Sequence, residues 1–436
     1  MRCQELIFKN YASDSQRKRG LSKAICLTVL CCAVTAFATA ELTTAQSYSV
    51  LYRFTGTPDG ASPLQSNLLD VNGTFFGTTN TGGDYGFGTI FQLNGLGEET
   101  VLYSFTGGTD GAFPDAGLVR DSAGNLYGTT EHGGNLSCAI GNSIGCGVVY
   151  KISSTAQFSV FYAFTDKTDG AWPQGLVMDS AGNLYGTTAF GGDLSCAIEL
   201  PYGCGVVYRL DSKGNLTSLY SFSDGPGGTL PDGFLTLDAS GNLYGATSTG
   251  GILTYCPDIG CGVLYKLDTS GHETVLYSFT NRTDGGNPVG HLQLDSEGNV
   301  YGTTFEGGDL SCSGLQPTLG CGVVFEVTPS GKEKILHTFT GADGAVPGFG
   351  LLRSSSGNFY GTTVYGGAEN MGTVFEVGAK GGERVVYSFT GAADGGLPQS
   401  GLTLDAKGNL YSSTSSGGDL TCNPPAGCGT LFRIRP

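Results

Sequence analysis

A nine-residue segment that recurs along the whole chain constrains its fold more than any other feature. Its clearest copy is Leu126-Tyr-Gly-Thr-Thr-Glu-His-Gly-Gly134. Related copies occur at 184–192, 243–251, 300–308 and 359–367, and more degenerate copies at 75–83 and 410–418. The aromatic residue at the second position places the seven copies 51 to 59 residues apart, at Phe76, Tyr127, Tyr185, Tyr244, Tyr301, Tyr360 and Tyr411. Such a period indicates one repetitive domain.

Each repeat contains four short segments with the character of β-strands. In the second repeat these are residues 117–121, 126–130, 147–152 and 158–164. They are rich in β-branched and aromatic residues and are bounded by glycine, asparagine, aspartate or serine, as short strands are. No window shows helical periodicity over about ten residues. Four antiparallel strands per unit, repeated around an axis, are typical of a β-propeller blade.

The two ends of the repeated region predict how the ring closes. Residues 49–54 match the fourth strand of a repeat, and residues 430–434 match the third. Seven complete blades result only if the first of these strands joins the last blade. A stacked solenoid is the structural alternative, but it would leave both fragments as open sheet edges, which proteins avoid. We therefore predict an all-β fold, a seven-bladed β-propeller of four-stranded antiparallel blades spanning residues 48–436, with the N-terminal strand closing the last blade.

The repeat also resembles a known family. The pattern Gly-Leu-x-x-Asp-Ser-x-Gly-Asn-Leu-Tyr is similar to the blades of NHL-type propellers. The Leu-Tyr-Gly-Thr-Thr-x-x-Gly-Gly core, the strand at 147–151 and the segment at 103–112 resemble the bacterial tandem-repeat family known as GloVer. The resemblance covers nearly all of residues 48–436. It implies an exported bacterial protein and brings no established activity, and because the chain stops at Pro436, directly after its last strand, it implies free secretion.

The first 40 residues are typical of an export signal. A basic cluster at 17–23 precedes an apolar run at 24–37, and Ala38-Thr39-Ala40 offers a small-residue cleavage site. We expect a signal peptide at 1–40, cleaved near Ala40, a short linker at 41–47 and no membrane span in the mature chain. Cleavage would change the formal charge from −16 to −20. Such an acidic protein repels nucleic acid and anionic membrane surfaces.

Ten cysteines fall into five local pairs, each in the loop between the second and third strand of one repeat. In the two repeats without cysteine this loop has only four residues, 84–87 and 368–371. A zinc site is the alternative, but no pair has the two-residue spacing of a zinc knuckle and no histidines accompany the pairs. In an exported protein we expect disulfides. They would join Cys138 to Cys146, Cys196 to Cys204, Cys256 to Cys261, Cys312 to Cys321 and Cys422 to Cys428.

Strand order places these loops and the loops after the fourth strands on the same face of the ring, while the opposite face receives only short turns. Binding residues usually lie on such elaborated loops. Aromatic residues at variable positions of this face could form a platform for sugar rings or apolar side chains. Packing between neighbouring loops is the alternative interpretation. The candidates, together with one histidine, are Trp172, Phe113, Phe190, Phe305, Tyr365 and His132.

The acidic residues of this face are weaker candidates. Six aspartates precede glycine in the loops after the fourth strands and favour capping of their own turns, although such a ring could collect calcium. They are Asp59, Asp110, Asp169, Asp284, Asp343 and Asp394. Catalysis would need a residue unlike its counterparts in other repeats, for which Glu131, Glu306 and His132 are the candidates. His337 replaces a tyrosine of the fourth strand, which packing explains.

Together these observations favour an exported, non-catalytic binding or scaffold propeller. Its ligand, a glycan or cell-surface polymer, would meet the face that carries the disulfide loops. A polysaccharide hydrolase or lyase using carboxylates of the same face is one alternative, and a structural surface or matrix protein is another. We expect a monomer located outside the cytoplasm, either secreted or periplasmic, with no cofactor other than the calcium considered above.

Overall fold

The computed structural model describes residues 46–435 except 66, 142, 197–201, 258 and 313–319. The predicted signal peptide and most of the predicted linker lie outside these described residues. From Ser47 onward the chain forms one compact unit. Within the described residues, no helix has the length and apolar character needed to cross a membrane.

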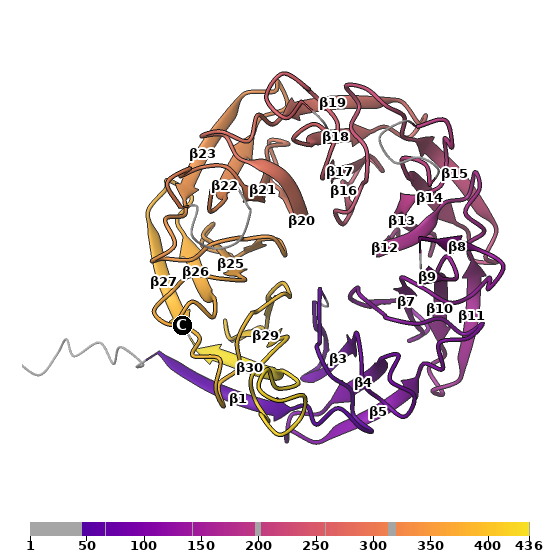
Figure 1. The fold of residues 1–436 in the computed structure, drawn as a ribbon, viewed down its shortest axis with the longest axis vertical. Helices are drawn as coiled ribbons and strands as arrows, with labels where there is room; N and C mark the ends of the chain where they lie inside the picture. The colour runs from indigo at the N-terminus through magenta and orange to yellow at the C-terminus, as the bar shows by residue number, and fades with distance from the viewer. Residues whose placement is uncertain are drawn as a thin grey trace, which may run out of the picture. The chain divides into compact units, whose positions relative to one another are not determined.

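Seven four-stranded antiparallel sheets surround a central axis, which confirms the predicted seven-bladed propeller (Figure 1). From the axis outward, blade 1 contains β2 (Leu69–Val71), β3 (Thr74–Thr79), β4 (Thr89–Leu93) and β5 (Glu99–Ser104), and blade 2 contains β6 (Val119–Arg120), β7 (Leu126–Thr130), β10 (Val148–Ile152) and β11 (Phe158–Ala163). Blade 3 contains β12 (Ala171–Met178), β13 (Leu184–Phe190), β14 (Val206–Leu210) and β15 (Leu216–Ser221), and blade 4 contains β16 (Thr236–Leu237), β17 (Leu243–Thr247), β18 (Val263–Leu267) and β19 (Glu273–Ser278). Blade 5 contains β20 (Gly286–Leu294), β21 (Val300–Glu306), β22 (Val323–Val327) and β23 (Glu333–Thr338), and blade 6 contains β24 (Leu352–Arg353), β25 (Phe359–Thr363), β26 (Thr373–Val377) and β27 (Glu383–Ser388).

Blade 7 is built from both ends of the domain. Its strands are β28 (Thr403–Leu404), β29 (Leu410–Thr414), β30 (Thr430–Arg435) and, outermost, β1 (Ser47–Arg53). Strand β1 pairs antiparallel with β30 from Ser47 opposite Arg435 to Arg53 opposite Thr430. The predicted closure of the last blade by the first strand is therefore confirmed.

The glycine of the Leu-Tyr-Gly-Thr-Thr core is required by packing within the blade. In blade 2 the phenol of Tyr150 on β10 lies over Gly128 on β7, so that a Cβ atom at Gly128 would sit 2.3 Å from the hydroxyl oxygen. Tyr150 is fully buried. The same pairing joins Gly186 to Tyr208 and Gly245 to Tyr265. The repeated motif thus records a repeated contact between the second and third strands.

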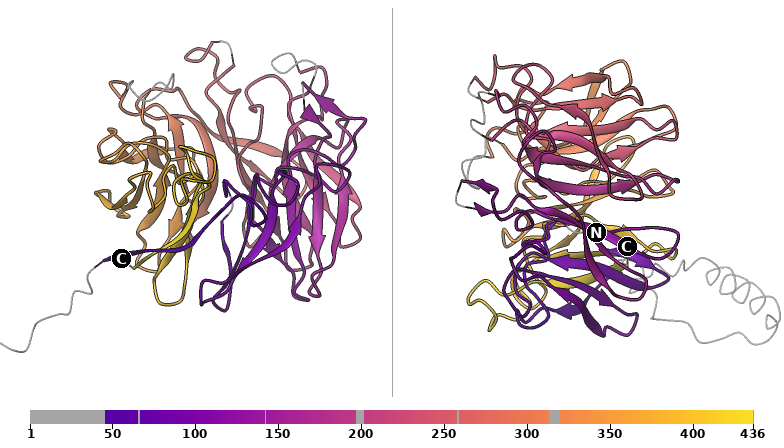
Figure 2. Two further views of the ribbon diagram at one scale, coloured as in Figure 1. Left: turned by 60° about the horizontal axis from the view of Figure 1, so that its bottom comes forward. Right: turned by 90° about the vertical axis from the view of Figure 1, so that its right-hand side faces the viewer.

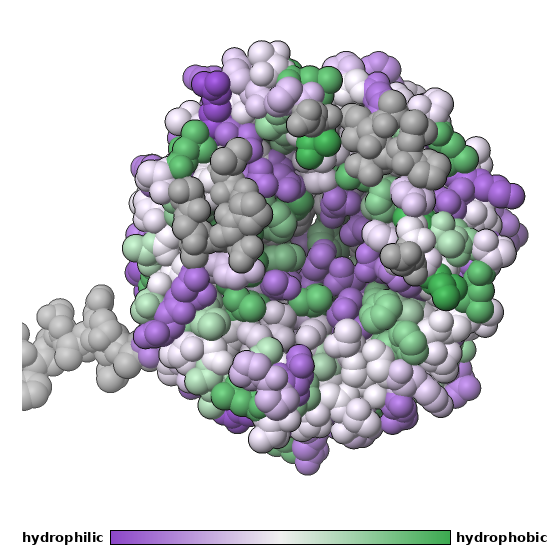
Figure 3. Space-filling view, viewed as in Figure 1, coloured by the Kyte–Doolittle hydropathy of each residue, from purple (hydrophilic) through white to green (hydrophobic). Residues whose placement is uncertain are grey.

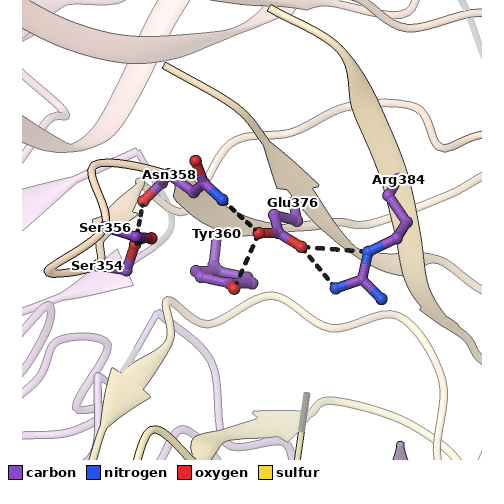
Figure 4. A network of polar contacts seen from close by, with 6 residues as sticks. All are labelled: Ser354, Ser356, Asn358, Tyr360, Glu376 and Arg384. Carbon is purple, nitrogen blue, oxygen red and sulfur yellow. Dashed lines mark hydrogen bonds and ion pairs between the residues drawn. The ribbon is translucent and has the colours of Figure 1, made fainter. Parts of the chain in front are cut away.

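In blade 6 the turn between the first and second strands departs from the repeat, and a glutamate of the same blade accepts the hydrogen bonds that the turn residue accepts elsewhere (Figure 4). In five blades an aspartate of this turn accepts hydrogen bonds from the asparagine amide and the tyrosine hydroxyl of the motif, as Asp121 does from Asn125 and Tyr127. Blade 6 has Ser354 at that position. There Glu376 on β26 accepts from Asn358 Nδ2 at 2.7 Å and from the Tyr360 hydroxyl at 3.0 Å. Arg384 holds the other oxygen of Glu376.

All five predicted disulfides are present, with Cα–Cα distances of 5.5 to 5.8 Å. In blade 2 the disulfide loop also forms a small hairpin, β8 (Ala139–Ile140) with β9 (Ser143–Ile144). Figure 2 shows long loops, this hairpin among them, on one face of the ring and short turns on the other. Disulfides in this number are typical of proteins outside the reducing cytoplasm.

Candidate ligand-binding site

A cavity of about 380 Å³ opens at the centre of the face that carries the disulfide loops. Figure 3 looks onto this face and shows it hollowed at the axis, with hydrophilic and hydrophobic residues around the hollow. Six of the seven blades contribute to the wall. The lining residues are Gln65, Asp115, Glu131, Trp172, Gln174, Ala189, Phe190, Leu230, Asp232, Ser248, Thr249, Asn287, Val289, Gly290, Phe305, Gly348 and Phe349.

Each blade's inner loop is fastened to the blade before it. The residue before the loop proline donates its N–H to a backbone carbonyl of the preceding blade, as Trp172 does to Cys146 at 3.0 Å. The proline itself packs against the glycine that precedes the third strand of that blade, as Pro173 does against Gly147. In all seven blades the residue before the proline has a φ between 51° and 59°, although none is glycine. Because this unfavourable conformation recurs in every blade, it belongs to the propeller itself.

Three carboxylates face the cavity from blades 2 and 4. Asp115 accepts a hydrogen bond from Gln65 Nε2 at 3.1 Å, and its Oδ1 is buried without a hydrogen-bond partner. Asp232 accepts from the Ser248 hydroxyl at 2.7 Å. Burial and the charge of Glu131 raise the pKa of Asp115 well above its usual value. Burial and the charge of Asp232 raise the pKa of Glu131 to about 7.

The charge of this cavity selects against anionic ligands. No lysine or arginine is among its lining residues, within the part of the chain that the structure describes. The carboxylates therefore have no cationic side chain beside them in the wall. Neutral ligands with hydroxyl groups match such a wall, because carboxyl groups with raised pKa values, such as Asp115 and Glu131, can donate as well as accept, whereas phosphates and uronic acids would repel every carboxylate that is ionised.

Aromatic side chains form one side of the cavity and continue behind it. Trp172 and Phe190 line the cavity and meet edge to face, with ring centroids 4.9 Å apart. Behind them His132 stacks on Trp172 at 4.9 Å, and Phe113 meets His132 at 5.4 Å. The indole Nε1 of Trp172 is buried without a hydrogen-bond partner. On the far side Phe305 lines the wall together with Phe349.

The structure separates the predicted ligand-binding residues into two groups. Trp172, Phe190 and Phe305 line the cavity. Phe113 and His132 pack behind Trp172, and Tyr365 packs against the hydrophobic cluster between blades 5 and 6. Packing between loops accounts for Phe113, His132 and Tyr365, whereas ligand binding by the three residues that line the cavity stays a prediction.

The structure places the two acidic catalytic candidates, Glu131 and Glu306, at different cavities. Glu306 lines a different cavity, beside Asn281 and Arg282, and accepts a hydrogen bond from Asn281 Nδ2 at 2.9 Å. The carboxylate of Glu131 instead lies 3.8 Å from His132 Nδ1, and its charge interacts with Asp115 and Asp232. The reason is geometric. Two residues precede the Gly-Gly pair of each repeat, and Glu131 is the first of them in blade 2, whereas Glu306 is the second in blade 5.

The six calcium candidates lie in the loops that follow the outermost strands, and their oxygens are engaged within their own turns. Asp169 is representative, since it accepts from the N–H and hydroxyl of Thr165 and from the hydroxyl of Tyr162. Comparable bonds are made by Asp59, Asp110, Asp284 and Asp394, and Asp343 has a histidine in place of the tyrosine.

Sequence reasoning missed the polar residues that follow the loop prolines. Asp115, Gln174 and Asp232 occupy this position and line the cavity. Their variability was visible in the repeat, since the corresponding residues of the other blades are Leu64, Val289, Gly348 and Gln399. The candidates Trp172 and Phe113 come directly before their loop prolines, whereas these polar residues come directly after them.

The buried carboxyl groups predict that folding stability decreases between about pH 4.5 and pH 7. Burial raises the pKa values of Glu99, Glu131 and Glu333 from 4.5 to about 7. The folded state then holds protons that the unfolded state releases, so the stabilisation is complete below about pH 4.5 and is lost as pH rises through 7. We expect Tm to fall by several degrees over this interval and not to recover above it.

Calorimetry across pH 4 to 8 measures this effect, and Glu131→Gln provides the control because its side chain cannot ionise. The variant should lose part of the pH dependence between pH 5 and 7. A Tm that rises with pH through this interval in the parent protein would contradict the assignment.

The chain is similar to one sequence family and, more distantly, to several solved structures. The sequence model of the Gloeobacter/Verrucomicrobia repeat matches residues 37–139, 138–315 and 313–436. No curated protein sequence matches the chain. A protein from Bacteroides uniformis assigned as a 6-phosphogluconolactonase is 16% identical with a TM-score of 0.48, over 79% of this chain and 89% of its own. The PQQ-bound aldose sugar dehydrogenase from Streptomyces coelicolor is 11% identical with a TM-score of 0.45, over 89% of this chain and 98% of its own. These distant likenesses concern the fold alone, whereas the sequence match spans nearly the whole chain, which therefore belongs to the Gloeobacter/Verrucomicrobia repeat family.

Proposed function

We propose that this protein is an exported, non-catalytic binding protein that holds a carbohydrate in its central cavity. The observation that carries the proposal is the composition of one wall, where aromatic rings lie beside carboxylates and amides. Sugars present apolar C–H faces and a rim of hydroxyl groups, so they match a site that offers both kinds of contact. The five disulfides support a location outside the cytoplasm.

The acidic wall narrows the class of carbohydrate. Asp115, Glu131 and Asp232 are acceptors for hydroxyl or ammonium groups, and Gln65 and Gln174 add amide groups to the same wall. Neutral and amino sugars therefore fit the site better than uronic acids or sulfated sugars do. A volume of about 380 Å³ is in the range of small-molecule sites, so we expect it to accept one or two sugar rings of a longer polymer.

Removing the aromatic wall should abolish most of the affinity. We expect Trp172→Ala and Phe190→Ala each to weaken binding by about 10 to 100 times, because buried aromatic anchors contribute on the order of 2 kcal/mol or more. Titration calorimetry with chito-oligosaccharides, neutral β-glucan oligosaccharides and oligogalacturonates measures this effect and compares amino, neutral and anionic sugars.

Tyr365→Ala is the matched control, because Tyr365 occupies the same repeat position as Phe190 but does not line the cavity. It should leave affinity unchanged. Equal binding by the parent protein and both cavity variants would refute the site, and preferential binding of oligogalacturonates would refute the electrostatic argument.

A second candidate function, hydrolysis or elimination of a polysaccharide, is favoured by one observation at the same site. Glu131 has a pKa of about 7 and lies near two further carboxyl groups, and acid catalysis at sugars commonly uses one carboxyl kept protonated beside another that is ionised. Release of reducing ends from the same three glycan types, abolished by Glu131→Gln without loss of binding, would favour this function over simple binding.

A further inference from the structure

The outer rim has a repeated arrangement at the junctions between blades. Near the end of five of the seven outermost strands a tyrosine hydroxyl donates to the aspartate of the following loop, as Tyr277 does to Asp284 at 3.1 Å. At two of these junctions the glutamate that begins the next blade's outermost strand also lies near the tyrosine–aspartate pair. At the junction between blades 4 and 5 that residue is Glu333, whose pKa is raised by burial and by the charge of Asp284. Tyrosine, aspartate and glutamate thus meet from two blades.

The junction between blades 5 and 6 replaces this tyrosine with His337. Strands β23 and β27 supply the two sides of the junction and lie next to one another at the rim (Figure 1). His337 Nε2 lies 2.9 Å from Asp343 Oδ2. One ligand atom each from His337, Asp343 and Glu383, the first residue of β27, lie within 4.8 Å of one another.

The chemistry of this junction differs from that of its counterparts in one respect. Glutamates with a buried, unpartnered Oε1 also occur at Glu99, Glu273 and Glu333, so the acidic residue alone is a feature of the repeat. A neutral tyrosine is a poor metal ligand, whereas a neutral imidazole is among the commonest. Only His337, among the seven residues at this repeat position, supplies one.

We propose that His337, Asp343 and Glu383 bind a divalent transition-metal ion of the zinc class, which links blades 5 and 6. Metal bonds to imidazole nitrogen and carboxylate oxygen are about 2.0 to 2.2 Å long. Two such bonds at the tetrahedral angle place the ligand atoms about 3.3 to 3.6 Å apart, so His337 and Asp343, which form a hydrogen bond at 2.9 Å, need to separate by only about half an ångström to admit the ion. One imidazole with two carboxylates suits a transition metal better than calcium, which takes six to eight oxygens.

Access and charge at the junction are suitable for such an ion. The side chains of His337 and Asp343 are 17% and 18% exposed, so an ion can enter and water can complete its coordination. Arg384 adjoins Glu383 in sequence, but its guanidinium is held by Glu376. The other two clusters of candidate ligands in the described residues each contain two cysteines joined in a disulfide, whereas the cluster of His337, Asp343 and Glu383 contains no cysteine.

Metal titration of the chelator-treated protein tests the proposal. We expect one Zn²⁺ per chain by calorimetry, a rise in Tm of several degrees at about 100 times Kd, and visible absorption bands with Co²⁺. His337→Tyr recreates the tyrosine–aspartate pair of the neighbouring junctions, so it should fold and lose all three responses. Unchanged Zn²⁺ binding by this variant would overturn the assignment, as would Ca²⁺ binding that His337→Tyr leaves intact while Zn²⁺ gives no response.

The repeat also offers a gain-of-function test. Tyr277→His places an imidazole beside Asp284 and Glu333, which reproduces the cluster one junction earlier. We expect the stoichiometry to increase from one Zn²⁺ to two, and the double variant Tyr277→His with His337→Tyr to return it to one. If Tyr277→His folds and binds no additional ion, then the three residue types at this junction are insufficient and the proposal is wrong.

Discussion

Deletion of β1 together with Phe54 is expected to unfold blade 7 and to destabilise the whole ring. This strand is the outermost one of blade 7 and supplies six paired positions to β30. Without it, β30 becomes an open edge, and the blades at both sides of the break lose a neighbour. Phe54, which directly follows β1, is completely buried in the cluster that joins blades 7 and 1. Truncating a buried phenylalanine alone costs about 3 to 5 kcal/mol, so the deletion should cost more than that.

The position of the only tryptophan makes this prediction measurable at a distance. Trp172 lies in blade 3, so its fluorescence reports on a part of the ring that β1 does not touch. If closure stabilises the ring as one cooperative unit, the guanidinium midpoint of the deletion variant should fall equally by fluorescence and by circular dichroism. A synthetic peptide of residues 46–56 should restore part of the loss by adding the missing strand.

Phe54→Ala is a milder version in case the deletion variant does not fold. Its fluorescence midpoint should decrease as well. If the midpoint reported by Trp172 is unchanged in a variant whose circular dichroism shows loss of blade 7, the ring does not unfold cooperatively and closure acts only locally.

The fold could be predicted because one set of local contacts is repeated seven times. Where a glycine of the second strand packs under a tyrosine of the third, as Gly128 does under Tyr150, both residues appear at fixed positions of the repeat. The closure of the ring could be predicted because the strands at the two ends of the domain form a complete four-stranded blade only when they are combined. Cysteine pairing was predictable too, since both partners of each pair lie in the same short loop.

The sequence predicted the face of the ring on which the cavity opens, but not the residues that line the cavity. Which side chains converge at the axis depends on how far each loop reaches after its proline, and these loops differ in length. Pro173 is three residues before the core leucine Leu176, whereas Pro114 is four residues before Leu118. For this reason the sequence did not single out Asp115 as a residue that lines the cavity.

Contacts between residues of different blades could not be predicted from the sequence either. His337 was interpreted as a packing residue because its substitution for tyrosine was visible but its neighbour was not. Glu383 follows it by more than forty positions and reaches the same point from the next blade. A repeat alignment compares equivalent residues, and this contact joins residues that are not equivalent.

Loss of the disulfides should have the second large effect, on both stability and the central cavity. Chain entropy assigns about 2 to 3 kcal/mol to closing each of these short loops, so loss of all five approaches the total stability of an ordinary domain. Replacement of Cys138 and Cys146 by serine should cost about that amount for one loop. The carbonyl of Cys146 accepts the N–H of Trp172, so we also expect weaker carbohydrate binding in this variant.

The two cysteine-free blades supply the matched control. In blade 6 the loop at 368–371 needs no disulfide, and the carbonyl of Met371 accepts the N–H of Leu397 at 2.8 Å, as Cys146 does for Trp172. Replacing residues 135–146 with this four-residue loop should therefore retain both the stability and the affinity that the serine variant loses. Denaturant unfolding and glycan titration of the two variants compare these outcomes. If the short-loop variant is as unstable as the serine variant, the disulfide does more than restrain a long loop, and the explanation by loop length fails.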